Sequence, residues 1–195
     1  RLAPENAYPS ALDDCHFVLQ WVIDHGSIFD FDASRIIIGG DSAGGNLAAA
    51  LALKMRDENR KDVIYQYLIF PCLDTDFETD SYLHNKNDPF LSREQMIGFW
   101  NDYLRGKLNT EDYLALPQRC QDLSGLPPAY ILAADLDPLR DDALHYGKKM
   151  GRAGVPVTVR NVEGAIHGFV RARFFSNVVE KEILNLASAI RQSIE

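Results

Sequence analysis

The chain has 195 residues, a length typical of one domain that buries a sizeable core. A formal net charge of −8 excludes the basic surface that nucleic acids and anionic membranes require, and no apolar run is long enough to span a bilayer. Cys15, Cys72 and Cys120 are widely spaced and form no metal-binding pattern. We therefore expect reduced thiols in a cytoplasmic protein without a metal site.

The first helix is expected over residues 10–25. Ser10 is a suitable N-cap, and Asp13 and Asp14 would place carboxylates in the positively polarised first turn. Apolar residues then recur at helical spacing until Gly26, which is typical of a helix end.

A strand, a sharp turn and a helix are predicted next. The β-branched run Ile36–Ile38 is typical of a buried parallel strand, and the small residues from Ala43 onward indicate a helix that packs closely on a sheet and ends near Asn59. Between them lies the spacing Gly-x-Ser-x-Gly of a nucleophile elbow, with Ser42 at its apex. Such a turn strains the apex residue, and the flanking glycines leave room for the backbone. We predict Ser42 as a nucleophile and the Ala43 N–H, at the positive helix terminus, as an oxyanion donor.

A phosphate-binding turn is the alternative for this segment. Its fingerprint needs a glycine where Asp41 stands, because the backbone must approach a pyrophosphate there and a carboxylate would repel it. A P-loop also fails, since no Gly-Lys-Ser/Thr follows. The sequence favours the serine nucleophile.

A second buried strand, residues 63–70, is followed by an irregular excursion over residues 71–110. Its acidic stretch 74–80 lacks the glycine and glutamate of a calcium loop, so we expect it to be solvated rather than metal-binding. A helix beginning at Ser92 carries an aromatic face suited to the core, to a ligand pocket or to both. The excursion residues predicted to contact substrate are Leu73, Phe99 and Trp100.

Two further strands, 129–134 and 157–162, alternate with helices over 139–151 and 177–193. Repeated strand–helix–strand units predict a mostly parallel sheet in a three-layer α/β fold, with residues 1–195 forming one domain.

Ser42, Asp137 and His167 each follow a strand, so we expect them to meet at the sheet edge where ligands of parallel sheets bind. The chain order Ser, Asp, His is that of the α/β-hydrolase triad. Serine alone is too weak a nucleophile. His167 would take its proton and return it to the leaving alcohol, while Asp137 would fix the imidazole tautomer. Further candidate substrate contacts near these residues are Asp41, Ile166 and Phe169.

The choice of carboxylate has alternatives. Asp137 followed by Pro138 is also a sound N-cap with proline at the first helical position, which would make its role structural. Asp135 is the rival triad acid. Asp141 and Asp142 are interpreted as first-turn charges of the following helix.

Five segments together resemble the hormone-sensitive-lipase-like branch of the α/β-hydrolases, the bacterial carboxylesterase family. They are Arg-Leu-Ala-Pro-Glu (1–5), Ala-Leu-Asp-Asp (11–14), Gly-Asp-Ser-Ala-Gly-Gly-Asn-Leu-Ala (40–48), Asp-Pro-Leu-Arg-Asp (137–141) and His-Gly-Phe (167–169). The resemblance covers essentially the whole chain. It implies a hydrolase of small-molecule carboxylic esters that needs no cofactor and prefers short to medium acyl chains. It also implies the triad Ser42, Asp137 and His167, and it is compatible with homodimers that pair through the last strand.

Members of that family carry a His-Gly-Gly-Gly motif upstream of Arg-Leu-Ala-Pro-Glu, and its glycine N–H groups serve the oxyanion hole. No such motif precedes Arg1, so we expect the C-terminal portion of an esterase, with the remainder absent or supplied by another chain. Loss of one oxyanion donor costs about 10²–10³ in rate. Two alternatives therefore stay open: an impaired fragment or non-catalytic small-molecule binder, and an amidase or lactonase with the same triad.

Overall fold

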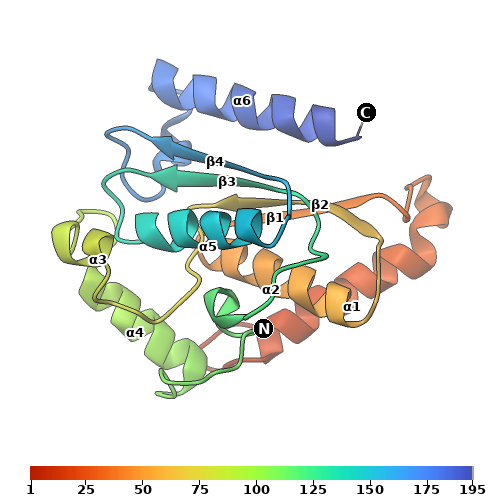
Figure 1. Cartoon of the computed structure of the whole chain (residues 1–195), viewed down its shortest axis with the longest axis horizontal. Coiled ribbons are helices and arrows are strands. Elements are labelled where there is room, and N and C mark those ends of the chain that lie inside the picture. Colours follow the sequence, from red (N-terminus) through yellow and green to blue (C-terminus); the bar gives the residue numbers. More distant parts are fainter. Residues whose placement is uncertain (195) are drawn as a thin grey trace.

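The computed structural model describes residues 1–194 and places four parallel strands in one sheet, in the order β1-β2-β3-β4 (Figure 1). The strands are β1 (Ile36–Asp41), β2 (Val63–Ile69), β3 (Ala129–Ala134) and β4 (Val157–Val162). All neighbouring pairs run in the same direction, so the carboxyl ends of the four strands share one edge. The predicted parallel sheet is confirmed.

Helices cover both faces of this sheet (Figure 1). One face carries α2 (Ala43–Asp57) and α5 (Arg140–Arg152), with α1 (Ser10–His25) packed against α2. The other face carries α6 (Asn177–Ile194). Short 3-10 turns lie at Gly26–Phe29, Pro117–Arg119 and Phe169–Ala172. The result is the three-layer α/β arrangement that parallel strands and helical crossovers produce.

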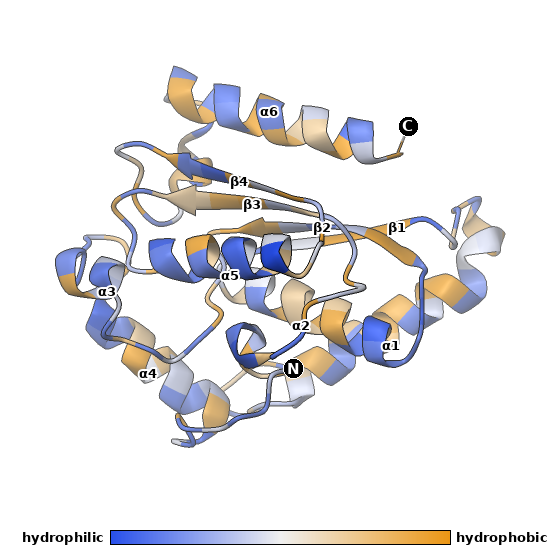
Figure 2. Ribbon diagram, viewed as in Figure 1, coloured by the Kyte–Doolittle hydropathy of each residue, from blue (hydrophilic) through white to orange (hydrophobic). Residues whose placement is uncertain are grey.

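Strand β3 is buried along its whole length and separates two apolar cores. Ile131 and Ala133 pack with the core under α2 and α5, whereas Tyr130 and Leu132 pack with the core under α6. This alternation follows from the two-residue period of a strand. Figure 2 shows hydrophobic and hydrophilic residues alternating along α6, the pattern of a helix with one side on the sheet and the other in solvent.

Three local expectations differ from the structure. The run Ile36–Ile38 is half-buried rather than buried, because within residues 1–194 β1 is an edge strand. Ser10 is the first residue of α1 and makes no capping bond, while Pro9 occupies the N-cap position. Helix α2 ends at Asp57, before Asn59 takes a φ of 56° in the left-handed region.

Residues 71–110 leave the sheet after β2 and carry two helices, α3 (Asp80–His84) and α4 (Arg93–Leu104). Helix α4 begins with a capping box: the Ser92 hydroxyl accepts from the Gln95 N–H, and the Gln95 side chain accepts from the Ser92 N–H. The excursion supplies most of a smaller apolar core, which includes its residues Tyr82, Leu91, Met96 and Trp100 and also Leu139 from outside it. It is a packed unit rather than an open loop.

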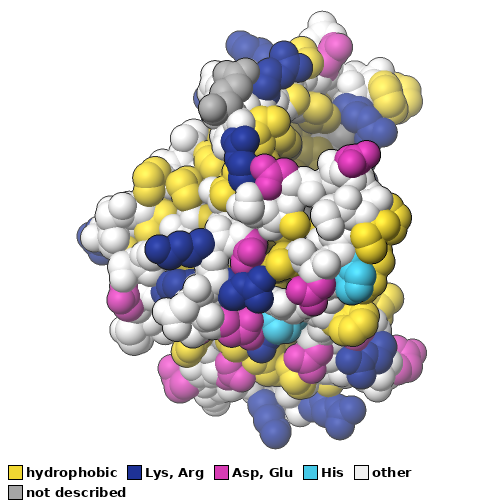
Figure 3. All heavy atoms as spheres, turned by 90° about the vertical axis from the view of Figure 1, so that its right-hand side faces the viewer, with side chains coloured by type: hydrophobic (Ala, Val, Ile, Leu, Met, Phe, Trp, Pro, Cys, Tyr) yellow, Lys and Arg dark blue, Asp and Glu magenta, His cyan; other side chains and the backbone are white. Residues whose placement is uncertain are grey.

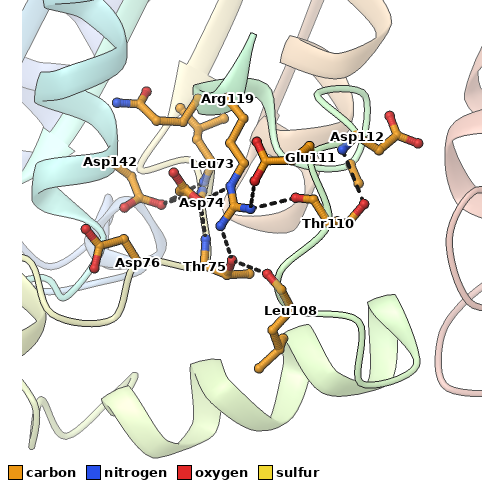
Figure 4. A network of polar contacts seen from close by, with 12 residues as sticks. Leu73, Asp74, Thr75, Asp76, Leu108, Thr110, Glu111, Asp112, Arg119 and Asp142 are labelled. Atoms are coloured by element: carbon orange, nitrogen blue, oxygen red, sulfur yellow. Dashed lines mark hydrogen bonds and ion pairs between the residues drawn. The ribbon is translucent and has the colours of Figure 1, made fainter.

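Arg119 fastens this excursion to the chain that follows it (Figure 4). Its guanidinium donates to Asp74 Oδ1 at 3.0 Å, to the Thr75 hydroxyl at 3.0 Å and to the Thr110 carbonyl at 2.6 Å. The Thr75 hydroxyl donates in turn to the Leu108 carbonyl at 2.8 Å. The acidic stretch therefore takes part in protein contacts, and the described part of the chain holds no cluster of side chains suited to a metal ion.

Asp142 makes a second attachment from the first turn of α5 (Figure 4). Its Oδ2 accepts from the Leu73 N–H at 2.7 Å and from the Asp74 N–H at 3.3 Å. Burial raises the pKa of Asp142 well above its ordinary value, although the Leu73 and Asp74 N–H groups act against this shift. Instead of an ordinary first-turn charge, Asp142 is a buried acceptor for the excursion backbone.

We expect Asp142→Asn to change how stability depends on pH. Because the pKa is raised on folding, the folded chain keeps a proton that the unfolded chain releases. This contribution is complete below the ordinary carboxyl pKa of about 4 and is lost as pH rises toward the folded value. Urea unfolding at a series of pH values measures this. As pH rises above about 4, the free energy of unfolding of the variant should increase relative to that of the parent, by up to about 1.4 kcal/mol per pH unit. Asp80→Asn, at an exposed position, is the control; a difference between parent and Asp142→Asn that does not vary with pH would contradict this account.

The turn from β1 into α2 leaves no space for a side chain at Gly40. A Cβ built there lies 2.4 Å from the backbone of Gly44, whereas a Cβ on Gly44 meets nothing within 4 Å. The two glycines of the elbow motif therefore differ. Close approach of the backbone requires glycine at position 40, and no steric contact requires it at position 44.

Gly40→Ala should lower the free energy of unfolding by about 1–3 kcal/mol, because backbone atoms must move to accept the methyl group. Gly44→Ala is the matched control and should raise stability by about 0.5–1 kcal/mol, the usual gain from replacing glycine inside a helix. Chemical denaturation of both variants measures the difference, and equal effects would contradict the steric argument.

Candidate active site

Ser42 lies at the apex of the β1–α2 turn in a backbone conformation that is rare for residues other than glycine. Its φ is 56° and its ψ is −118°. Its N–H donates to the Ile69 carbonyl at the end of β2 at 2.9 Å, and its carbonyl accepts from the Asn46 N–H at 3.1 Å. The neighbouring strand and the first turn of α2 together hold the strained turn.

Three side chains from separate loops meet at this edge of the sheet. His167 Nε2 lies 3.0 Å from Ser42 Oγ, and His167 Nδ1 lies 2.7 Å from Asp137 Oδ2. The other oxygen of Asp137 accepts from the Leu139 N–H at 2.9 Å, so both carboxylate oxygens are engaged. The series has the geometry of a nucleophile, a base and an orienting acid.

The His167 ring is also held by packing. The Phe70 ring lies against it with centroids 4.7 Å apart and an interplanar angle of 61°. Gly168 follows with a φ of 72°, and a Cβ there would lie 3.3 Å from the Phe90 ring. With 8% of its surface exposed, His167 has little freedom to leave its two partners.

Asp137 is fully buried, and this burial raises the pKa of its carboxyl. The hydrogen bond with His167 acts against this shift because it favours the charged form, as does the Leu139 N–H. A charged Asp137 therefore depends on its histidine partner. The same contact would stabilise an imidazolium formed by proton transfer.

The rival carboxylate, Asp135, has other partners. It accepts from Asn161 Nδ2 at 3.3 Å and from the Gly164 N–H at 3.4 Å, and it lies 4.0 Å from the Arg140 guanidinium. These contacts join the end of β3 to β4, to the loop after β4 and to the start of α5. The structure brings Asp137, rather than Asp135, to the histidine.

The N-cap alternative for Asp137 differs from the structure. Helix α5 begins at Arg140 and Leu139 occupies the N-cap position, so Asp137 lies two residues before the N-cap. Its side chain accepts one backbone N–H, from Leu139, and keeps the other oxygen for His167.

A cavity of about 310 Å³ lies beside the elbow. Its walls come from the N-terminal segment, from α1 and α2, and from α4, and they are largely apolar. The lining residues are Leu2, Ala3, Ala11, Ala43, Asn46, Leu47, Cys72, Met96, Phe99, Trp100, Asp102 and Tyr103. Such a cavity is suited to an apolar group held next to Ser42.

Phe99 and Trp100, two predicted substrate contacts, line this cavity together with Ala43, the predicted oxyanion donor. Leu73 does not line it, because its side chain is fully buried in the core between the sheet, α2 and α5.

The three other predicted contacts also lie outside the cavity walls. Phe169 is buried against Phe70, with ring centroids 5.9 Å apart, in the core under α6. Ile166 is half-buried beside His167, and Asp41 is exposed at the end of β1. Proximity in sequence to a predicted triad residue did not place these side chains on the cavity.

Sequence reasoning missed Ser81 and Asn85, which contact the loop that carries Asp137. Ser81 Oγ donates to the Pro138 carbonyl at 2.6 Å, and Asn85 Nδ2 donates to the Asp137 carbonyl at 3.2 Å. The one local signal in the sequence was that Ser81 and Asn85 are polar and four residues apart, a spacing that places two side chains on the same side of a helical turn.

The outer surface of the described part of the chain shows no sign of a nucleic-acid-binding site. On the face in Figure 3, acidic and basic side chains are interspersed without a continuous basic field. None of the helices between residues 1 and 194 has the length and hydrophobicity of a transmembrane helix.

Comparisons with known proteins agree with this geometry. A family described as alpha/beta hydrolase fold matches residues 1–171. Esterase LipI of Mycobacterium tuberculosis is 39% identical over 172 residues, which cover 87% of this chain and 53% of that protein. Carboxylesterase NlhH of the same organism is 39% identical over 174 residues, covering 87% of this chain and 54% of its own length.

The solved structure of a bacterial heroin esterase superposes with a TM-score of 0.96 at 36% identity, covering 100% of this chain and 63% of that one. The chain spans about half the length of the curated relatives named above. The parallel sheet, the elbow and these similarities lead to one conclusion: the chain belongs to the alpha/beta hydrolase fold family, in the hormone-sensitive-lipase-like carboxylesterase branch that its motifs resemble.

Proposed function

We propose that this chain carries the hydrolytic centre of a serine carboxylesterase, with Ser42 as nucleophile, His167 as general base and acid, and Asp137 as the orienting acid. The observation that carries the proposal is the unbroken series of hydrogen bonds from Ser42 Oγ through His167 to the buried Asp137. The esterase and carboxylesterase names of the similar proteins support the same reaction class.

The first half of the reaction forms an acyl-enzyme. Ser42 Oγ attacks the ester carbonyl carbon while its proton passes to His167 Nε2, and Asp137 stabilises the resulting imidazolium through Nδ1. The C–O bond to the alcohol then breaks, and His167 Nε2 returns the proton to the leaving oxygen. The alcohol departs and the acyl group stays on Ser42.

The second half repeats these steps with water. His167 Nε2 takes a proton from water as its oxygen attacks the acyl carbon, and the proton then passes to Ser42 Oγ as the ester bond to the enzyme breaks. The products are a carboxylic acid and the free serine. One ester and one water are consumed for each acid and alcohol formed.

The oxyanion of each tetrahedral intermediate needs donors. Ala43 is the first residue of α2, where N–H groups have no partner within the helix and the helix dipole is positive. We propose its N–H as one donor. The glycine motif expected upstream of Arg1 would supply the others.

We propose a small ester with a short to medium acyl chain as substrate. The largely apolar cavity of about 310 Å³ beside Ala43 supports this choice, since it is near the lower end of ligand-pocket sizes. In this proposal residues 1–195 form one catalytic domain. The excursion 71–110 supplies part of the pocket, because Met96, Phe99 and Trp100 of α4 line the cavity.

The direct test is hydrolysis of p-nitrophenyl butyrate by the 195-residue chain and by its Ser42→Ala variant. We expect turnover by the parent and a loss of at least about 10³-fold in kcat for the variant, because no nucleophile remains. A measurable rate of the parent that the substitution leaves unchanged would refute the role of Ser42.

A p-nitrophenyl alkylphosphonate distinguishes a missing oxyanion donor from a wrong nucleophile. An activated serine displaces p-nitrophenolate from phosphorus and keeps the phosphonyl group, which mass spectrometry locates. We expect the adduct on Ser42 of the parent and none on Ser42→Ala. A folded parent that gives neither hydrolysis nor adduct would favour a non-catalytic binder.

Asp137→Asn should lower kcat by about 10³–10⁴-fold with little change in KM, because an amide neither holds the required imidazole tautomer nor stabilises the imidazolium. Asp135→Asn is the matched control two residues away, and it should keep the kcat of the parent. Equal losses in the two variants would contradict the assignment of Asp137 as the triad acid.

A further inference from the structure

The loop that carries Asp137 is held by side chains that the proposed mechanism does not use. Asn85 Nδ2 donates to the Asp137 carbonyl at 3.2 Å, and Ser81 Oγ donates to the Pro138 carbonyl at 2.6 Å. Ser81 lies in the short helix α3, and Asn85 is the residue that directly follows it. One turn of the excursion therefore fixes two consecutive peptide carbonyls at the proposed acid.

Ser81 is in turn held by Asp141. The Ser81 N–H donates to Asp141 Oδ2 at 2.8 Å, and the Asp141 N–H donates to Ser81 Oγ at 3.1 Å. Ser81 is fully buried, so loss of its hydroxyl would leave polar backbone groups without a partner in the interior. This reciprocal pair joins α3 to the first turn of α5.

Asp137 has little backbone support of its own. It lies between β3 and α5, outside both. Its N–H makes a long bond of 3.4 Å to the Ala134 carbonyl, and its carbonyl accepts one backbone N–H, from Arg140 at 3.1 Å. Both of its side-chain oxygens are engaged, so the position of the backbone at residue 137 decides whether Oδ2 reaches His167 Nδ1. The contacts from Ser81 and Asn85 act on that backbone directly.

We propose that Ser81 and Asn85 are positioning residues, which hold the Asp137 loop so that its carboxylate stays within hydrogen-bond distance of His167. This inference rests on the proposed function, because it assigns a purpose to the placement of the triad acid. The apolar core of the excursion joins α3 and α4, and α4 lines the cavity beside Ser42. The wall of the proposed acyl site and the support of the acid therefore belong to one packed unit.

Ser81→Ala and Asn85→Ala each remove one of the two side-chain donors to this loop. For the 195-residue chain we expect kcat for p-nitrophenyl butyrate to fall by up to about 100-fold in each variant with KM unchanged, since a small displacement of a catalytic group has an effect of this size. His84→Ala is the matched control from the same helix. Its side chain is exposed and its ring bonds to the Asp80 carbonyl of its own helix, so this variant should keep the kcat of the parent.

Proton NMR provides a readout that does not depend on turnover. The His167 Nδ1–H shared with Asp137 should give a far-downfield resonance, and we expect it to broaden or move upfield in Ser81→Ala and Asn85→Ala but not in His84→Ala. If the variants show these changes while the parent gives neither hydrolysis nor the phosphonate adduct, the proposed function is rejected and the positioning role is supported. An unchanged resonance in both variants would overturn the positioning role, whether or not their kcat falls.

Discussion

The left-handed backbone at Ser42 is the constraint on which the rest of the site depends. A φ of 56° is unfavourable for a residue with a side chain, and it persists because β2 and α2 bond the peptide groups on both sides of it. The same turn brings the helix backbone so close to Gly40 that no side chain fits there. One strained residue therefore determines where the Ser42 hydroxyl stands, where α2 begins and which N–H groups have no partner within that helix.

The parallel sheet brings other loops of the chain next to this turn. Because all four strands end at the same edge, loops far apart in the chain meet beside Ser42. Burial increases the energetic importance of these contacts. Asp137 is fully enclosed, where a carboxylate without a partner is costly, and its hydrogen bond with His167 supplies that partner. The interaction that would orient the base also makes the buried charge tolerable.

The excursion after β2 links the apolar cavity to the loop of Asp137. Two adjacent carboxylates in the first turn of α5 accept its backbone N–H groups: Asp141 accepts from Ser81, and Asp142 accepts from Leu73 and Asp74. Arg119 completes the attachment by donating to the Asp74 carboxylate and to the Thr110 carbonyl. A substitution in this excursion can therefore affect both the shape of the apolar cavity and the placement of Asp137, even where it touches neither.

The sequence by itself determined the elements whose conformation is local. A β-branched run, a Gly-x-Ser-x-Gly spacing and a run of small helical residues restrict the backbone through sterics alone, and from these the strand, the elbow, the helix and the parallel α/β fold were predictable. The order of Ser42, Asp137 and His167 followed from where the strands end. Only the tertiary structure decided that Asp137 rather than Asp135 reaches His167, because both lie in one irregular segment. The Asp135 carboxylate accepts from Asn161 of β4, whereas the Asp137 carboxylate contacts His167 and accepts from the Leu139 N–H. It also decided that Leu73 belongs to the core and that Ser81 contacts the loop of Asp137, since burial and long-range hydrogen bonds depend on residues that are distant in the chain.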